Sequence, residues 1–226
     1  MKLAQLLPTR AEFGGLSLNL TREAERHGAR IHRRSEVTPE MIAVEKPDAV
    51  ILATGSRTHP PAIEGEAAHM VHAVDILSGT ATTGARVVIY DWHADWIGAG
   101  LAEKLAAEGV QVRLAVNGMS AAANIQSYVR FEIIGRLHKL GVEVHPWLRL
   151  YGADDRTAYF IHTAAREAVV FEDIDTLVLA VPNHPVDELA SAIAVLGIEH
   201  HIIGDCLTPR TAEEAVYEGL KAGMVV

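Results

Sequence analysis

Apolar residues follow two spacings along this chain, one typical of buried strands and one typical of helices. Continuous or alternating apolar residues predict short strands, and apolar residues three or four positions apart predict helices. Strands are expected at residues 29–34, 49–53, 86–90, 110–116, 142–145, 159–163, 168–171, 175–181 and 201–205. Helices are expected at residues 16–27, 98–108, 124–140 and 211–223. Thr211 followed by Glu214 fits a capping box at the start of the last helix.

The order of these elements predicts the class of fold. Strands alternate with helices over most of the chain, which favours a parallel α/β sheet with helices on both faces. Residues 159–163 and 168–171 are expected to pair as antiparallel strands. Ligands of parallel sheets bind beyond the C-terminal ends of the strands. That rule directs attention to four loops, at residues 54–56, 91–100, 117–118 and 204–206.

Composition narrows the functional classes. The 226 residues carry a net charge of -9, which argues against a nucleic-acid-binding surface. No apolar run is long enough to span a bilayer, and we expect a cytoplasmic protein. A single cysteine, Cys206, excludes an internal disulfide and a multi-cysteine cluster. The 12 histidines match no strong ligand motif, so we expect no metal site, and no catalytic residue is identified.

The first candidate ligand site follows the apolar run at residues 49–53. Ala53, Thr54, Gly55 and Ser56 are small, and a glycine at a strand end lets a ligand approach the backbone closely. The alternative interpretation is an ordinary turn between a strand and a loop.

The second candidate site lies between the last predicted strand and the last helix. Gly204 exposes the backbone, Asp205 can accept a hydrogen bond from a sugar hydroxyl, and Cys206 follows. The next helix offers its N-terminal N–H groups to a phosphate. Alternatively, Asp205 caps a turn and binds nothing.

The third candidate is the loop after the predicted strand at residues 86–90, where a dinucleotide-binding fold carries G-x-G-x-x-G. Only Gly98 and Gly100 are present, and they come late in the loop. The earlier positions hold two tryptophans, a histidine and two aspartates, which would obstruct and repel a pyrophosphate. We therefore expect a degenerate site that does not bind NAD(P).

The order of four stretches resembles the C-terminal nucleotide-binding region of the trimethylamine dehydrogenase and 2,4-dienoyl-CoA reductase (NADH:flavin oxidoreductase) family. They read PDAVILATGSR, RVVIYDWHADWIGAGLAEKLAAEGVQVRLAVNG, DTLVLAV and IGDCLTPRTAEEAVYEGLKAG. The altered glycine loop is more similar to the amine-dehydrogenase branch than to the NADPH-using reductases.

The resemblance implies two nested, doubly wound Rossmann-like domains with parallel sheets. Residues 1–80 and 182–226 would form a partial FAD- or ADP-binding domain without its first βαβ unit. Residues 81–181 would form an NAD(P)-binding-like domain. By position, Thr54, Gly55, Gly204 and Asp205 would lie on the FAD or ADP side, and Gly98 and Gly100 in the second domain.

The resemblance also implies partners. Family members carry an N-terminal β/α barrel with FMN and an iron–sulfur cluster, and they pass electrons to an external carrier. We therefore expect this chain to be the nucleotide-binding, electron-transfer portion of a flavin-dependent oxidoreductase, incomplete as an enzyme by itself. The alternative is a structural or docking module with degenerate nucleotide sites that self-associates through an exposed apolar face. An NAD(P)H-dependent reductase that acts alone is the least favoured hypothesis.

Overall fold

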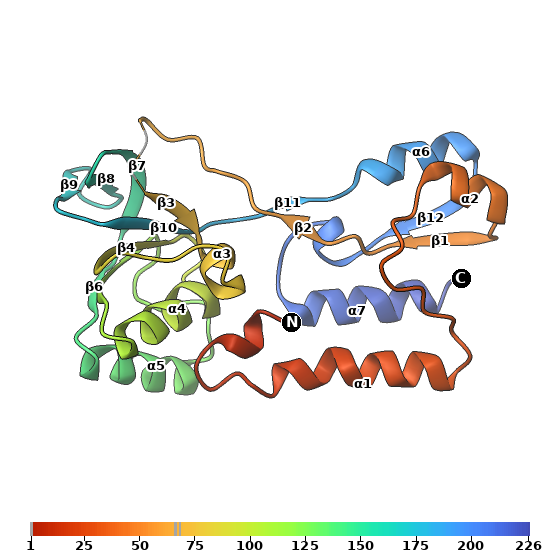
Figure 1. Ribbon diagram of the computed structural model, residues 1–226, viewed down its shortest axis with the longest axis horizontal. Coiled ribbons are helices and arrows are strands. Elements are labelled where there is room, and N and C mark those ends of the chain that lie inside the picture. Colours follow the sequence, from red (N-terminus) through yellow and green to blue (C-terminus); the bar gives the residue numbers. More distant parts are fainter. Residues whose placement is uncertain (1, 66, 68) are drawn as a thin grey trace. The chain divides into compact units, whose positions relative to one another are not determined.

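The computed structural model describes residues 2–65, 67 and 69–226, and it divides into two compact units (Figure 1). The large unit comprises Met1–Asn19 and Pro60–Val181, and the small unit comprises Leu20–His59 and Pro182–Val226. The N-terminal segment contains a 3₁₀ helix, Ala4–Leu6, and α1, Phe13–Arg26. The assignment of FAD- or ADP-binding and NAD(P)-like roles to the two domains stays a prediction.

A five-stranded parallel sheet forms the centre of the large unit. In spatial order it contains β3 (Met70–His72), β10 (Thr176–Ala180), β4 (Arg86–Asp91), β5 (Gln111–Val116) and β6 (Glu143–His145). All neighbouring strands in it are parallel. Strands β10 and β4 are buried almost along their whole length, as their continuous apolar runs predict. The predicted parallel α/β class is therefore confirmed.

The two faces of this sheet are covered by different kinds of structure. Three helices pack on one face: α3 (Ala73–Ser78), α4 (Trp96–Ala107) and α5 (Ser127–Lys139). A three-stranded antiparallel sheet packs on the other: β7 (Leu148–Asp154), β8 (Thr157–His162) and β9 (Ala168–Phe171) (Figure 1). The expected antiparallel pairing of residues 159–163 with 168–171 is confirmed.

The prediction of helices on both faces was wrong for the large unit. Phe160 and Phe171 of the antiparallel sheet pack against Val88, Tyr90 and Leu177 of the parallel sheet. Strand β7 supplies the remaining apolar contacts of this layer, and the sequence pattern had not indicated it. The three short antiparallel strands thus cover the second face of the parallel sheet. In a fully doubly wound domain, a second layer of helices covers that face.

The small unit is built around two parallel strands, β1 (Ala49–Leu52) and β12 (Glu199–Ile202). A second pair, β2 (Ser56–Arg57) and β11 (His184–Pro185), is antiparallel. Helices α2 (Pro39–Glu45) and α6 (Glu188–Leu196) lie on one side of β1 and β12, and α7 (Ala212–Gly223) lies on the other (Figure 1). A 3₁₀ turn, η2 (Gly204–Cys206), follows β12.

One predicted strand was wrong in this unit. Residues 29–34 form no regular element, because only one residue of this stretch, Ile31, is a good strand former and the rest are mostly charged. Gly28 ends the preceding helical turn with φ of 87°. The predicted capping box of α7 is confirmed: Thr211 Oγ1 accepts from the Glu213 N–H, and the Glu214 carboxylate accepts from the Thr211 N–H.

Candidate functional site

The C-terminal ends of β1 and β12 bring two of the predicted loops together. The two strands pair in parallel from Ala49 with Glu199 to Leu52 with Ile202. One more ladder bond follows, in which the Ile203 N–H donates to the Leu52 carbonyl at 2.9 Å. Residues 53–56 and 204–206 therefore leave the sheet at the same edge. We call this group of residues the strand-end cluster.

A hydroxyl, a thiol and a carbonyl meet at the base of the strand-end cluster. Thr54 Oγ1 donates to the Val186 carbonyl at 2.5 Å and lies 3.0 Å from Cys206 Sγ. The Cys206 thiol lies 3.1 Å from the same carbonyl. Cys206 is fully buried against Ile42 and Leu52, so these contacts fix the two loops to the core of the small unit.

The second contact between the loops is centred on the Asp205 carboxylate. Ser56 Oγ donates to Asp205 Oδ2 at 3.0 Å, and Asn183 Nδ2 donates to Ser56 Oγ at 3.2 Å. The Arg210 N–H donates to Asp205 Oδ1 at 3.2 Å. Because a carboxylate can accept about four hydrogen bonds, Asp205 keeps acceptor capacity for a ligand hydroxyl. Asn183 and Arg210 were not predicted, although Arg210 lies in one of the stretches that carry the resemblance.

Gly204 turns the chain at the end of β12 in a left-handed conformation, with φ of 62°. Its N–H donates to Glu218 Oε2 at 2.7 Å, across from α7. This backbone bond, followed by the Arg210 guanidinium, lowers the pKa of Glu218. The first turn of α7 also carries Glu213 and Glu214. The carboxylates of Glu218 and Glu214 thus already accept from the Gly204 and Thr211 amides, close to the helix N-terminus that the sequence had suggested for a phosphate.

The remaining loop residues leave the backbone open. Gly55 has φ of 78°, and a Cβ placed on it would meet no atom within 4 Å. The Gly55 carbonyl accepts the Val186 N–H at 3.0 Å. Beyond this point the rings of His59 and His184 stack with centroids 3.9 Å apart. The strand-end cluster therefore combines an accessible glycine with a polar Ser–Asp pair, and a flat pair of imidazoles lies outside it in the same unit.

The glycine loop of the large unit is filled by the protein's own groups. The Asp91 carboxyl is completely buried, and Oδ1 accepts the Ala94 N–H at 3.0 Å. Burial, with Asp95 nearby, raises the pKa of Asp91 to about 8. Asp95 caps α4 by accepting the Ile97 N–H at 3.0 Å. Two aspartates of the loop therefore accept the backbone N–H groups of Ala94 and Ile97.

Gly98 and Gly100 serve packing inside the large unit. A Cβ on Gly98 would lie 2.3 Å from the Asp91 carboxyl carbon. A Cβ on Gly100 would lie 3.2 Å from Leu7 of the N-terminal segment. Next to them, the Arg10 guanidinium lies over the Trp96 ring at 3.6 Å. Both positions are thus accounted for by packing, because a side chain there would overlap the Asp91 carboxyl or crowd Leu7.

Comparison with known proteins places these geometries in context. No family model matches the chain. It is 28% identical over 170 residues to a probable N-methylproline demethylase of Rhizobium meliloti (strain 1021). This match covers 74% of this chain and 25% of the relative. It is 25% identical over 225 residues to an NADH oxidase of Thermoanaerobacter brockii. That match covers 98% of this chain and 34% of the relative.

Among solved structures, histamine dehydrogenase from Rhizobium sp. 4-9 superposes with a TM-score of 0.87 at 20% identity. The match covers 98% of this chain and 37% of that enzyme. The predicted resemblance is confirmed. The chain has the fold of part of a trimethylamine dehydrogenase-type flavin oxidoreductase, and it spans about a third of the length of the proteins it matches over nearly all its residues.

Within the part of the chain that the structure describes, no helix is both long and apolar enough to cross a membrane. Among those same residues, no three or more His, Cys, Asp or Glu side chains are grouped as a metal site would require.

Proposed function

We propose that this chain is the nucleotide-binding, electron-transfer portion of a flavin-dependent oxidoreductase, with FAD or ADP held at the strand-end cluster of the small unit. The observation that carries the proposal is the meeting of residues 53–56 and 204–206 at the C-terminal ends of two parallel strands. Ligands of open α/β sheets bind at this place in the fold.

The chain's own residues supply recognisable binding functions there. Gly55 leaves the backbone accessible to a flat or bulky group. Asp205, already oriented by Ser56, accepts a hydrogen bond from a ribose or ribityl hydroxyl. Glu218 and Glu214 already accept from the Gly204 and Thr211 N–H groups, so recognition would rest on the sugar and the base. An FAD bound here would supply the chemistry of one- or two-electron transfer.

NAD(P)H is excluded from the proposal by the glycine loop of the large unit. Asp91 and Asp95 already accept the N–H groups of Ala94 and Ile97 at the start of α4. A pyrophosphate would have to displace both side chains from these N–H groups, and the Asp95 carboxylate would repel it. Substrate chemistry, in this proposal, belongs to a barrel domain or subunit that carries FMN and an iron–sulfur cluster, and the electrons leave to an external carrier.

The experiment is a calorimetric titration of the purified chain with ADP, FAD and NADPH in turn. We expect binding of ADP or FAD and none of NADPH. Asp205→Asn keeps the size of the side chain but weakens acceptance from a hydroxyl, and we expect it to lower the affinity about tenfold. Asp187→Asn, an acid of the same unit outside the strand-end cluster, serves as the matched control. Absence of any ADP or FAD binding would refute the cofactor assignment.

A second function, a docking module without a cofactor, is favoured by two observations. Helix α7 presents Val216, Tyr217 and Leu220 at helical spacing to the surface, and Met224 follows at its C-cap. In addition, β1 and β12 pair only with each other among the described strands, which leaves both outer edges of this sheet without a ladder partner. Such a face is typical of a protein interface, and it predicts self-association that does not depend on nucleotide.

A further inference from the structure

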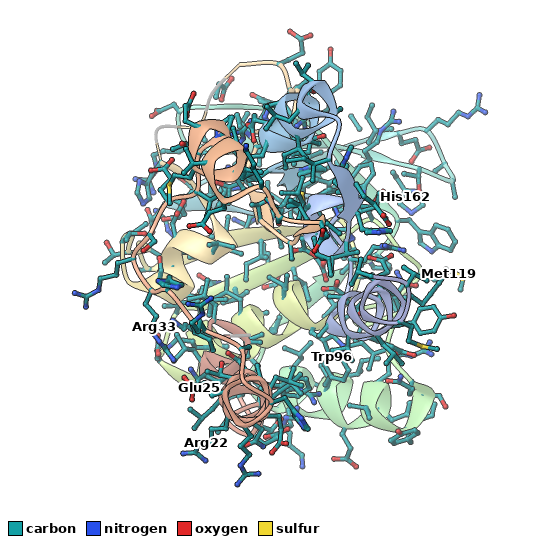
Figure 2. The ribbon with its side chains drawn as sticks, turned by 90° about the vertical axis from the view of Figure 1, so that its right-hand side faces the viewer. Arg22, Glu25, Arg33, Trp96, Met119 and His162 are labelled. Atoms are coloured by element: carbon teal, nitrogen blue, oxygen red, sulfur yellow. The ribbon has the colours of Figure 1, made fainter. Side chains whose placement is uncertain are left out.

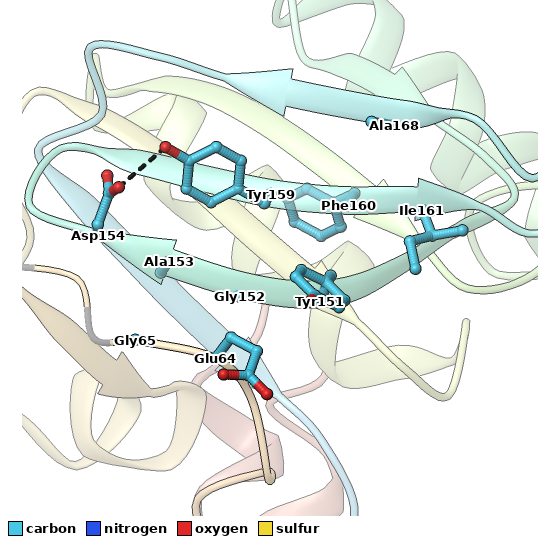
Figure 3. Close-up of a pocket in the computed structure, with 10 residues that line it drawn as sticks. All are labelled: Glu64, Gly65, Tyr151, Gly152, Ala153, Asp154, Tyr159, Phe160, Ile161 and Ala168. Atoms are coloured by element: carbon cyan, nitrogen blue, oxygen red, sulfur yellow. Dashed lines mark hydrogen bonds between the residues drawn. The ribbon is translucent and has the colours of Figure 1, made fainter.

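A cavity of about 510 Å³ lies on the outer face of the antiparallel sheet in the large unit (Figure 3). It is lined by Glu64, Gly65, Tyr151, Gly152, Ala153, Asp154, Tyr159, Phe160, Ile161 and Ala168. Its volume falls in the range of small-molecule sites, about 300–1,000 Å³. The cavity is separate from both the strand-end cluster and the glycine loop. We propose that it binds a small organic cation that has a flat apolar body.

One wall of the cavity is a short segment fastened to β7. The Glu64 N–H donates to the Tyr151 carbonyl at 3.0 Å, and the Ala153 N–H donates to the Glu64 carbonyl at 2.9 Å. The two backbones approach so closely that only glycine fits at the contact. A Cβ on Gly65 would lie 2.3 Å from the Ala153 carbonyl oxygen, and one on Gly152 would lie 2.5 Å from the Glu64 carbonyl oxygen.

A β-bulge directs a tyrosine to this wall. The pairing of β7 with β8 shifts between Leu150 and Gly152, so that Tyr151 is an extra residue without a partner in the register. Its side chain is 54% exposed. Bulges commonly re-aim a side chain beside a functional site. In Figure 3, Tyr151 and the Glu64 carboxylate lie together at this side of the cavity.

A second tyrosine is held by a second carboxylate. The Tyr159 hydroxyl donates to Asp154 Oδ2 at 2.9 Å, the bond drawn dashed in Figure 3. This bond and the charge of Asp154 raise the pKa of Tyr159, so the phenol stays neutral. Ile161 lies two residues further along β8, on the same face as Tyr159. Ile161 and Ala168, which pair on neighbouring strands, supply an apolar surface beyond Tyr151, at the end of the cavity away from Asp154.

The charges of these groups decide the class of ligand. The charged side chains that line the cavity, Glu64 and Asp154, are both acids. Of the neighbouring cations, Arg156 is bound to Asp175 at 2.7 Å, and Arg149 lies opposite Ile161 in the register of β7 with β8. Tyrosine ring faces attract cations, and a carboxylate beside them strengthens the attraction. An anion or a phosphate would be repelled. An amidine, a primary amine or a quaternary ammonium on an aromatic or aliphatic body complements both the charge and the apolar wall.

Benzamidine and its neutral counterpart benzamide test the charge requirement directly. Both are titrated into the whole chain with isoleucine methyl groups labelled, and the signal of Ile161 is followed by NMR. We expect benzamidine to shift Ile161 with a Kd of about 1 mM, as is ordinary for so small a ligand, and benzamide to bind at least about fivefold more weakly. Equal binding of the two compounds, or no shift at Ile161, would overturn the proposal.

Variants locate the cation. Glu64→Gln and Asp154→Asn each remove one charge, and we expect each to lower benzamidine affinity about fivefold. Tyr151→Leu keeps an apolar side chain without the ring face, and we expect it to weaken benzamidine more than benzamide. Glu132→Gln, an exposed acid on α5, is the matched control and should change nothing. Unchanged affinity in both carboxylate variants, with folding intact by their spectra, would also overturn the proposal.

Discussion

At the scale of single residues, the glycine loop shows how a familiar position can acquire a different role. A glycine at the position of Gly98 allows close packing of helix and strand in dinucleotide-binding folds. Here it leaves room for the Asp91 carboxyl, which occupies the space that a Cβ would need. Asp91 in turn accepts the Ala94 N–H and holds the loop. The residue pair replaces a ligand contact by an internal one.

Substitution of Gly98 tests this packing. We expect Gly98→Ala to destabilise the chain by about 1–3 kcal/mol, because the added methyl group overlaps a buried carboxyl. Gly135→Ala on α5 is the matched control: no atom lies within 4 Å of its Cβ, and alanine should stabilise that helix by about 0.5–1 kcal/mol. Urea unfolding measures both. A neutral Gly98→Ala variant would contradict the packing argument.

Asp91 also makes stability depend on pH. Its pKa is about 8 in the folded chain against 3.8 for an ordinary aspartate, so the folded state holds a proton that the unfolded state has lost between these values. The stability conferred by this group is complete below about pH 4 and falls as pH rises toward 8. Through this group, the free energy of unfolding falls by at most about 1.4 kcal/mol per pH unit.

Asp91→Asn should remove this contribution. We expect the unfolding free energy of the variant to change less between pH 5 and pH 8 than that of the unaltered chain. The difference between the two slopes, measured by urea unfolding at several pH values, isolates Asp91 from the other titrating groups. Glu132→Gln, an exposed acid, should leave the slope unchanged. Parallel slopes for Asp91→Asn and the unaltered chain would show that Asp91 is ionised when folded.

At the scale of elements, the sequence was most informative where a strand is buried on both faces. Residues 87–90 and 177–181 are continuous apolar runs, and both lie in central strands of the parallel sheet. Helix α6 was missed because its nine residues are apolar on nearly every side and give no amphipathic period. Helix α2 was missed although Thr38 and Pro39 are ordinary start signals, because seven residues are too few to show a period.

The candidate sites were predictable only where a local sequence pattern marks them. Small residues and glycines at strand ends identified residues 53–56 and 204–206, and parallel pairing brought them together. Glu218 and Asn183 reach this cluster from distant positions, and no local pattern could indicate them. The cavity beside β7 depends on a bulge and on two close backbone approaches, which only tertiary structure reveals.

At the scale of the whole molecule, the central question is whether the exposed face of α7 serves association. Its apolar side chains at positions 216, 217, 220 and 224 fall on one stripe, and Leu220 is 62% exposed. A solvated helix gains nothing from such a stripe, whereas burial against another surface gains about 25 cal/mol per Å² of apolar area. We therefore expect the purified chain to self-associate, with a fraction of dimer or higher oligomer that rises with concentration.

Sedimentation velocity over a range of concentrations measures this association, and a charge on the stripe should abolish it. We expect Leu220→Lys to sediment as a monomer with its folding free energy almost unchanged, because the replaced side chain is exposed. Val195→Lys is the matched control: Val195 lies on α6 of the same unit, outside the α7 stripe, and is 87% exposed, so its replacement should leave association intact. Because α7 contributes Glu218 to the strand-end cluster from the side opposite Leu220, the monomeric variant should still bind ADP or FAD if the cofactor proposal is right.

The unaltered chain itself provides the contrary outcome. If it sediments as a monomer at every concentration, the docking function is refuted, and nucleotide binding is then decided by the calorimetric titration alone.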